Sequence, residues 1–301
     1  MENENEITIG GGSTDANKVP GALENTQKFD KIAEALGNNP DIKPHMMAEM
    51  IDNEFPLITD TVELPSKGIF YNNKQSHIKV KQLTAEDENI LTSADLIRSG
   101  KVLDVLLDNA IIDSTLSADD MLTGDRNAVL LYLRKEGYGD NYEVRMTCPH
   151  CGEEFLDQVL LSELKYKTLK ENPDSDGWFS VSLPKTKWTI RFKLLTGKDE
   201  NYLVKAKELQ KKTKKNIAYS QLLTERFLRQ IVSINGKSDK LDIKKAIINM
   251  PIGDSLFLRE HMGSVEPGVD MDHEFICSKC GESFEEAIPI RANLFWPNAR
   301  I

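Results

Sequence analysis

The 301-residue sequence predicts an α+β fold that is an internal duplication of two lobes, each built from a β-hairpin and helices. The segments 81–91 and 193–203 share the same amino acid at 7 of 11 positions, where roughly 0.7 matches are expected by chance. Each segment contains the pattern LTxxDEN and follows a Leu-Pro dipeptide, at 64–65 and at 183–184. Each is followed by a Gly-Asp pair whose aspartate, Asp125 or Asp254, lies 23 residues ahead of a CxxCGE motif. An ordered series of motifs that occurs twice indicates two copies of one structural unit.

The four cysteines of the chain all lie in these two CxxC knuckles, as Cys148, Cys151, Cys277 and Cys280. A CxxC turn presents two thiolates on one side of a tight loop, at a spacing that suits a tetrahedral zinc ion. The glycine after each knuckle supplies the positive-φ position that such a turn often needs. Two knuckles give the four ligands of a closed structural zinc site, which stabilises a fold and leaves no open position for a reacting water.

Two alternatives to a zinc site within one chain stay open at this stage. A CxxC pair is also found as a redox dithiol or a disulfide, although a redox pair usually stands alone at a strand-to-helix junction. Here the residues before each knuckle, 142–146 and 274–276, are typical of strands, as in the hairpin of a zinc ribbon. Because 125 residues separate Cys151 from Cys277, the knuckles either join the two lobes of one chain or pair between subunits.

The first lobe, predicted as residues 56–172, contains strands, capped helices and the first knuckle. We expect a strand opening at 62–65, a strand and turn over 68–73, and a strand with one buried face over 78–83. Thr84 is a good helix N-cap, and Asp87 completes a capping box with it. The acidic residues 86–88 therefore cap a helix and are not expected to be catalytic. A further helix is expected near 125–135, ending at Gly137.

The second lobe, predicted as residues 173–301, repeats this order with an insert of 17 residues. The insert region is rich in lysine, which indicates a solvated helix face or a docking patch for an acidic surface. These lysines are Lys205, Lys207, Lys211, Lys212, Lys214 and Lys215. We expect residues 170–177 to link the lobes. The terminal aromatic residues Phe295 and Trp296 are expected in the core or as an anchor on a partner.

Residues 1–55 are predicted to be a flexible acidic tail with short helices. They hold 11 acidic and 4 basic side chains, a balance of −7 out of the total of −10. We expect disorder over residues 1–22, followed by short amphipathic pieces at 29–36 and 46–51 that bind a partner's groove or dock lightly on the body. The start of the chain lacks the basic and apolar regions of a signal peptide.

The remaining composition bears on the class of partner. Residues 56–301 are nearly neutral, with a balance of −3, so no basic nucleic-acid surface is expected. The sequence has no run of 18 apolar residues, so no membrane contact is expected. The only cysteines are the paired knuckles, which fits a reducing cytoplasm. The stretch 253–256 spells a serine-hydrolase signature, but Arg126 stands in the first lobe where Ser255 stands in the second, and we expect no enzyme activity.

Four motifs in order carry a resemblance to a known family: 64–68, LTAEDEN at 83–89, Gly124-Asp125-Arg126, and 137–140 running into the first knuckle. With these motifs, residues 60–165 resemble the baseplate hub subunits and hub assembly proteins of T-even-type contractile-tailed phages. The resemblance implies a non-enzymatic part in building the baseplate hub by binding other hub proteins. It implies a location in the host cytoplasm during assembly, or in the virion tail. The structural zinc is inferred from this sequence and not from the family.

One other function class fits the knuckles. A zinc-ribbon adaptor protein of transcription or translation carries similar CxxC pairs. Its fingers are usually basic, whereas the knuckles here are surrounded by Glu153, Glu154, Glu282, Glu285 and Glu286, which repel phosphates. The sequence therefore favours the structural or assembly protein over the adaptor.

Overall fold

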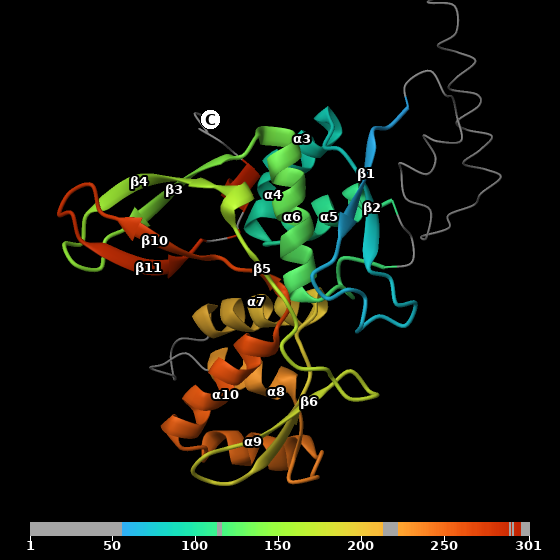
Figure 1. The fold of residues 1–301 in the computed structure, drawn as a ribbon, viewed down its shortest axis with the longest axis vertical. Helices are drawn as coiled ribbons and strands as arrows, with labels where there is room; N and C mark the ends of the chain where they lie inside the picture. The colour runs from blue at the N-terminus through green and yellow to red at the C-terminus, as the bar shows by residue number, and fades with distance from the viewer. Residues whose placement is uncertain (1–55, 113–115, 213–221, 289, 291, 296–301) are drawn as a thin grey trace, which may run out of the picture. The chain divides into compact units, whose positions relative to one another are not determined.

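The computed structural model describes residues 56–112, 116–212, 222–288, 290 and 292–295. The chain divides at Pro56, and the residues from Leu57 onward form one compact unit (Figure 1). This unit mixes helices with small antiparallel sheets, which confirms the predicted α+β class. The predictions for residues 1–55 lie outside the described residues. None of the helices described in the structure is both long and apolar enough to cross a membrane.

The unit begins with two antiparallel strands, β1 (Thr59–Glu63) and β2 (His77–Lys81). The alternating pattern of β2 buries Ile78 and Val80, as predicted. The strand expected to open at 62–65 instead ends at Glu63, and the strand expected within 68–73 is absent from this described stretch. Backbone N–H groups of this segment donate to carbonyls three residues earlier, as the N–H of Ile69 does to the carbonyl of Ser66. The segment therefore folds as consecutive turns and not as a strand.

Three helices follow β2: α3 (Ala85–Thr92), α4 (Ala94–Arg98) and α5 (Val102–Ala110). Helix α3 begins with the predicted capping box of Thr84 and Asp87. Asp87 is fully buried and also accepts hydrogen bonds from Lys81 Nζ and Asn109 Nδ2, both at 2.8 Å. Burial raises the pKa of Asp87, but its bonds with Lys81, Thr84 and Asn109 outweigh burial and hold this pKa below its ordinary value. The acidic first turn thus serves as a cap and an ion pair.

Helix α6 (Thr123–Tyr138) is the predicted helix near 125–135, and most of its residues are buried. It ends at Gly139, whose φ of 84° favours glycine. Arg134 is fully buried and donates hydrogen bonds to the carbonyls of Gly139, Asn141 and Leu294. Strands β3 (Asn141–Thr147) and β4 (Glu154–Leu160) then form an antiparallel hairpin, followed by the 3₁₀ turn η1 (Leu161–Glu163) and β5 (Tyr166–Lys167).

The C-terminal part contains a three-stranded sheet of β6 (Phe179–Ser182), β7 (Thr189–Phe192) and β8 (Ile231–Ile234). Its helices are α7 (Gly197–Lys212), α8 (Leu222–Gln230), α9 (Lys240–Ile248) and α10 (Ile252–Val265). Strand β9 (Gly268–Val269) pairs with β5, and β10 (Asp272–Ile276) forms a hairpin with β11 (Ser283–Ala287) before η2 (Ala292–Phe295). Of the predicted lysine run, Lys205 and Lys207 lie exposed on α7, and the other side chains lie outside the described residues.

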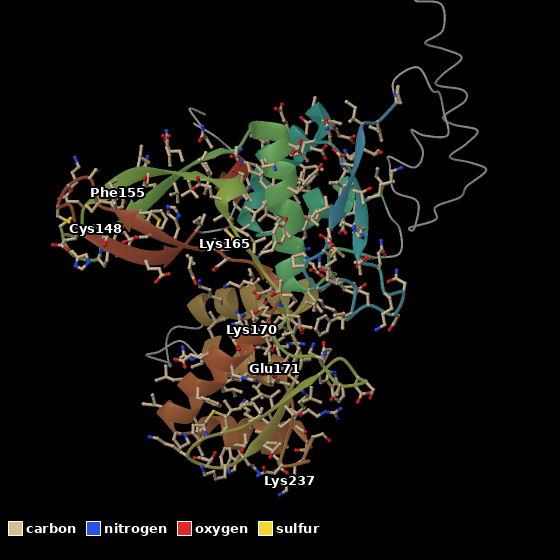
Figure 2. The ribbon with its side chains drawn as sticks, in the orientation of Figure 1. Cys148, Phe155, Lys165, Lys170, Glu171 and Lys237 are labelled. Carbon is tan, nitrogen blue, oxygen red and sulfur yellow. The ribbon has the colours of Figure 1, made fainter. Side chains whose placement is uncertain are left out.

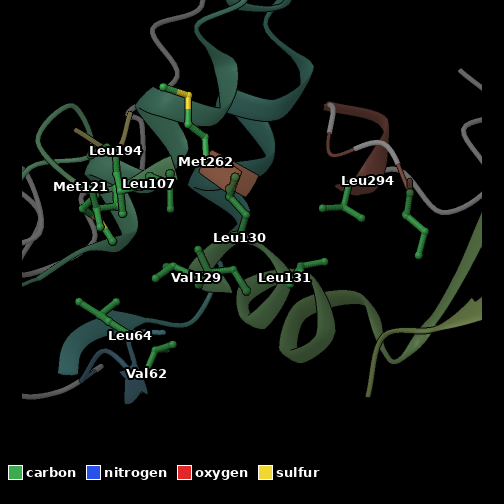
Figure 3. Packing of buried hydrophobic residues seen from close by; sticks show 14 of the residues in the cluster. Val62, Leu64, Leu107, Met121, Val129, Leu130, Leu131, Leu194, Met262 and Leu294 are labelled. Carbon is green, nitrogen blue, oxygen red and sulfur yellow. The ribbon is translucent and has the colours of Figure 1, made fainter. Parts of the chain in front are cut away.

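Buried side chains from both predicted lobes form one hydrophobic cluster (Figure 3). Leu130 of α6 and Met262 of α10 belong to it, as does Leu294 near the end of the chain. Phe295 is fully buried, which confirms the core placement predicted for this terminal aromatic residue; Trp296 lies outside the described residues. The boundary predicted between lobes at 172/173 stays a prediction.

Candidate metal centre

The two CxxC knuckles have the same local backbone structure. In the first, Cys148 N–H donates to the carbonyl of Glu153 at 2.9 Å, and Gly152 N–H donates to the carbonyl of Cys148 at 2.9 Å. The second repeats this pattern: Cys277 N–H donates to Glu282 at 3.0 Å and Gly281 N–H to Cys277 at 2.8 Å. The glycines have φ values of 77° and 79°, so the predicted positive-φ positions are confirmed.

Each knuckle lies at the end of a hairpin, and the two hairpins lie side by side (Figures 1 and 2). No backbone ladder joins the hairpins in the described sheets, because β3–β4 and β10–β11 form separate two-stranded sheets. They meet through aromatic rings instead. Phe155 of β4 and Phe284 of β11 contact edge to face with centroids 6.0 Å apart, and Phe284 also packs on its cross-strand neighbour Phe275. This aromatic contact joins the two hairpins without the help of a metal ion.

The four sulfur atoms form one compact cluster. Cys148 Sγ lies 3.7 Å from Cys280 Sγ, and Cys151 Sγ lies 3.8 Å from Cys277 Sγ. All four Sγ atoms lie within 4.8 Å of one another. These separations are too long for disulfide bonds, which require about 2.05 Å between sulfurs, and all four thiols are free. Four thiolates around a tetrahedral zinc with bonds of about 2.3 Å lie about 3.8 Å apart. The cluster therefore has the donor set and the spacing of a closed zinc site within a single chain.

The local backbone affects how readily the thiols ionise. Burial raises the pKa of the Cys277 thiol, but N–H groups of Cys280 and Lys279 and neighbouring thiols outweigh burial and lower this pKa to about 7. Lys279 N–H lies 3.4 Å from Cys277 Sγ. At Cys280 the N–H of Glu282 lowers the pKa, but burial and the other three thiols prevail and raise it to about 12. Because the four sulfur atoms lie within 4.8 Å of one another, a cation would be needed to hold several thiolates together.

The surroundings of the cluster also fit a structural role. Cys148 and Cys277 are each about 1% exposed, whereas Cys151 and Cys280 lie on the outer side. The glutamates beside the knuckles, Glu153, Glu154, Glu282, Glu285 and Glu286, are exposed. None of the described pockets is lined by any of the four cysteines.

The Gly-Asp pairs of the two predicted lobes have a structural role that the sequence did not reveal. Asp125, at the start of α6, accepts hydrogen bonds from Ser66 N–H at 2.9 Å, Ser66 Oγ at 2.6 Å and Tyr71 hydroxyl at 2.5 Å. Asp254, at the start of α10, accepts hydrogen bonds from the N–H groups of Lys185 and Thr186 at 2.8 and 2.9 Å. Each aspartate therefore holds the loop that follows a Leu-Pro dipeptide. The repetition of both motifs in the same order was the available signal.

The two aspartates differ in how well their charge is compensated. Burial raises the pKa of Asp125, and hydrogen bonds from Ser66 and Tyr71 offset only part of this effect. Burial also raises the pKa of Asp254, but there the bonds from Lys185 and Thr186 and the charge of Lys185 outweigh it, so this pKa is lowered.

Comparison with known proteins identifies similarity over part of the chain. Residues 57–183 match the family model described as T4 bacteriophage base plate protein. This range covers the first predicted lobe with its knuckle and stops ahead of the second LTxxDEN segment. The match supports the predicted resemblance to baseplate proteins over this range, and the assignment to the hub stays a prediction. No curated protein and no solved structure matches the chain.

Proposed function

We propose that this chain is a non-enzymatic structural or assembly protein of a phage tail baseplate hub, where it binds other hub proteins. The observation that carries the proposal is the match of residues 57–183 to the T4 base plate protein family. The matched range contains Ser66, Tyr71 and Asp125, the buried network that holds the Leu-Pro loop against α6. The chain would act in the host cytoplasm during assembly and remain in the virion tail if it is a subunit.

We further propose that Cys148, Cys151, Cys277 and Cys280 bind one structural zinc ion. The sulfur separations and the aromatic contact of Phe155 with Phe284 between the hairpins support this assignment. Structural zinc contributes roughly 10–16 kcal/mol of apparent binding free energy near neutral pH, which is at least as large as the net stability of a typical domain. The ion would join two hairpins whose cysteines lie 126 to 132 residues apart in sequence.

The proposed internal duplication supports this assignment. Several contacts recur at corresponding positions. The ion pair of Lys81 with Asp87 corresponds to that of Lys193 with Asp199, at 2.8 and 2.7 Å. Asp125 and Asp254 hold corresponding loops, and each knuckle connects the two strands of an antiparallel hairpin. Two related lobes each supply half of the ligands, which explains why one lobe alone has no complete site.

The zinc-ribbon adaptor is the weaker alternative. An adaptor that binds nucleic acid needs a basic surface near its ribbon, because phosphate contacts supply most of the affinity. The exposed glutamates around the cysteines oppose such contacts. A structural clamp has no such requirement, so the acidic knuckles are compatible with the baseplate role.

The proposal is tested by infection with a phage that lacks this chain. We expect tails without complete baseplates in electron micrographs, and rescue when the chain is supplied from a plasmid. Mass spectrometry of purified virions then separates a subunit, which is present, from an assembly factor, which is absent. Normal baseplates in the phage without this chain would overturn the proposal.

A further inference from the structure

The two predicted lobes meet where two helices begin. Thr123 N–H, at the start of α6, donates to the carbonyl of Leu195 at 3.0 Å. Gly197 N–H, at the start of α7, donates to the carbonyl of Met121 at 2.9 Å. The first N–H groups of a helix have no partner within the helix, so each helix start satisfies the other. We call this contact the joint.

The joint is heterologous, because the lobes contribute different surfaces to it. The first lobe contributes the start of α6, and the second contributes the start of α7. Under the proposed duplication, the start of α6 corresponds to the start of α10, and the start of α7 corresponds to the start of α3. The start of α10 and the start of α3 therefore take part in no such joint within the described chain. We call them the leftover surfaces.

The backbone groups at the two leftover surfaces are unpaired. Among the described residues, the carbonyls of Leu83 and Met250 and the N–H groups of Ala85 and Ile252 make no hydrogen bond. Their counterparts in the joint, Leu195, Met121, Gly197 and Thr123, all do. These four groups are two donors and two acceptors, and they stand at the positions that correspond to the two hydrogen bonds of the joint.

The start of α10 also exposes apolar side chains. Ile248 is 65% exposed and Ile252 is 79% exposed. They correspond to Asp119 and Thr123 of the joint, where Asp119 accepts bonds from Lys198 N–H and Asn201 Nδ2. Both exposed isoleucines thus stand at positions that the first lobe uses for contact. Exposed apolar side chains at such positions indicate a protein–protein contact surface.

The start of α3 is open at the matching places. Ala85 is exposed, whereas its counterpart Gly197 is buried in the joint. Gly139 has no atom within 4 Å of the position of an added Cβ, whereas its counterpart Gly268 packs on Gly124. Asn89 is exposed and makes no side-chain hydrogen bond among the described residues, whereas its counterpart Asn201 bonds Asp119.

The residue types at the leftover surfaces fit each other. A Cβ at Gly197 would lie 1.8 Å from Arg126 Nη1, so the joint requires glycine there. At the leftover surfaces the glycine is replaced by Ala85, and the arginine is replaced by Ser255. Ala85 is larger than glycine by one methyl group, and Ser255 is smaller than arginine. A contact between the leftover surfaces would therefore have space for the methyl group of Ala85.

We propose that a second copy of this chain docks at these surfaces, with the start of α10 of one copy on the start of α3 of the next. Charge favours this occupant, because residues 57–172 hold 20 acidic and 13 basic side chains, whereas 173–301 hold 17 acidic and 21 basic. A heterologous contact repeats from copy to copy and gives a ring when the rotation closes. The inference rests on the proposed duplication and deepens the proposed role by naming one partner.

The test uses the purified, zinc-loaded full chain in sedimentation velocity and light scattering over a range of concentrations. We expect the mass of the wild type to rise above the 34.0 kDa of one chain. Ile252→Glu blocks one end and Ala85→Arg blocks the other, so each variant alone is expected to stay monomeric. Mixed together, they still hold one intact end each, and we expect a one-to-one complex of two chains. Leu241→Glu, at an exposed leucine of α9 outside the surfaces, is the matched control and should associate as the wild type does.

Each result decides the inference. A wild type that stays monomeric up to its solubility limit overturns it, as does a variant mixture that stays monomeric while the wild type associates. Circular dichroism and thermal melts of each variant show whether it is folded, and an unfolded variant is replaced by Ile248→Glu or Glu86→Arg at the same surface. Because the assay uses no phage, a monomeric chain that is still required for baseplates would overturn the inference and leave the proposed function standing.

Discussion

Cys148 Sγ lies 3.7 Å from Cys280 Sγ, although 132 residues separate the two cysteines in sequence. Neither disulfide chemistry nor a shared backbone ladder accounts for this approach within the described structure, because the thiols are free and the two hairpins belong to separate sheets. The aromatic contact of Phe155 with Phe284 joins the two hairpins, and the proposed zinc ion would join them further.

Zinc content provides the first prediction. The purified chain should contain one zinc per molecule by elemental analysis. Cys148→Ser should lose the metal and unfold at a lower temperature, because a closed site loses a quarter of its ligands. His150→Ala, which changes an exposed residue between two cysteines, is the control and should keep the metal. Metal-free wild type with an unchanged melting temperature would argue against a structural ion.

Phe155 and Leu156 form a matched pair for the contact between hairpins. Phe155 is 5% exposed and Leu156 is 52% exposed on the same strand. Phe155→Ala should cost about 3–5 kcal/mol of unfolding free energy in denaturant titrations, since it removes a buried ring. Leu156→Ala should change it by less than about 0.5 kcal/mol, as surface substitutions usually do. Equal effects of the two substitutions would contradict the aromatic contact.

Asp87 and Asp199 are corresponding residues with different surroundings. Asp87→Asn should cost about 3–5 kcal/mol, because it leaves Lys81 buried with its charge uncompensated. Asp199→Asn should cost less, since the side chain of its partner Lys193 is 38% exposed and is reached by water. Urea titrations of both variants at neutral pH measure the difference, and a larger loss for Asp199→Asn would contradict it.

The same ion pair gives a pH dependence. The pKa of Asp87 is lowered by folding, so its stabilisation is present above the ordinary value of 3.8 and is lost as the pH falls through the folded pKa. The stability gap between the wild type and Asp87→Asn should therefore shrink below about pH 4, when both proteins are compared in the same zinc state. A gap that stays constant or widens on acidification would show that the charge of Asp87 is not involved.

Gly197 and Gly263 test the close packing of the joint. Gly197→Ala should destabilise the chain by at least about 1–3 kcal/mol, because the new methyl group would lie 1.8 Å from Arg126 Nη1 and 2.3 Å from the Ala118 carbonyl. Gly263→Ala on α10 meets no atom within 4 Å and should be neutral or stabilising by up to about 1 kcal/mol. Thermal melts of the two variants should move in different directions, and a neutral Gly197→Ala would contradict the packing.

The local parts of the structure were predictable from the sequence. The capping box at Thr84, the turns at Gly152 and Gly281 and the hairpins around the knuckles depend on residues a few positions apart. The clustering of the four cysteines within one chain was one of two arrangements that the sequence left open, because two knuckles with two ligands each can also pair between subunits. The tertiary position of residues 64–74 did not follow, because the Ser66 and Tyr71 bonds to Asp125 span 59 and 54 residues. The joint was not predictable either, since sequence similarity between the two predicted lobes does not tell which surfaces meet.

The hydrogen bond from Arg134 to the carbonyl of Leu294 spans 160 residues, so a buried side chain of α6 depends on a segment far along the chain. A buried guanidinium without its acceptors is costly, so we expect α6 to complete its packing only after the chain has been synthesised past Leu294. Although domains commonly fold in order during synthesis, α6 and the segment around Leu294 would then complete their folding together.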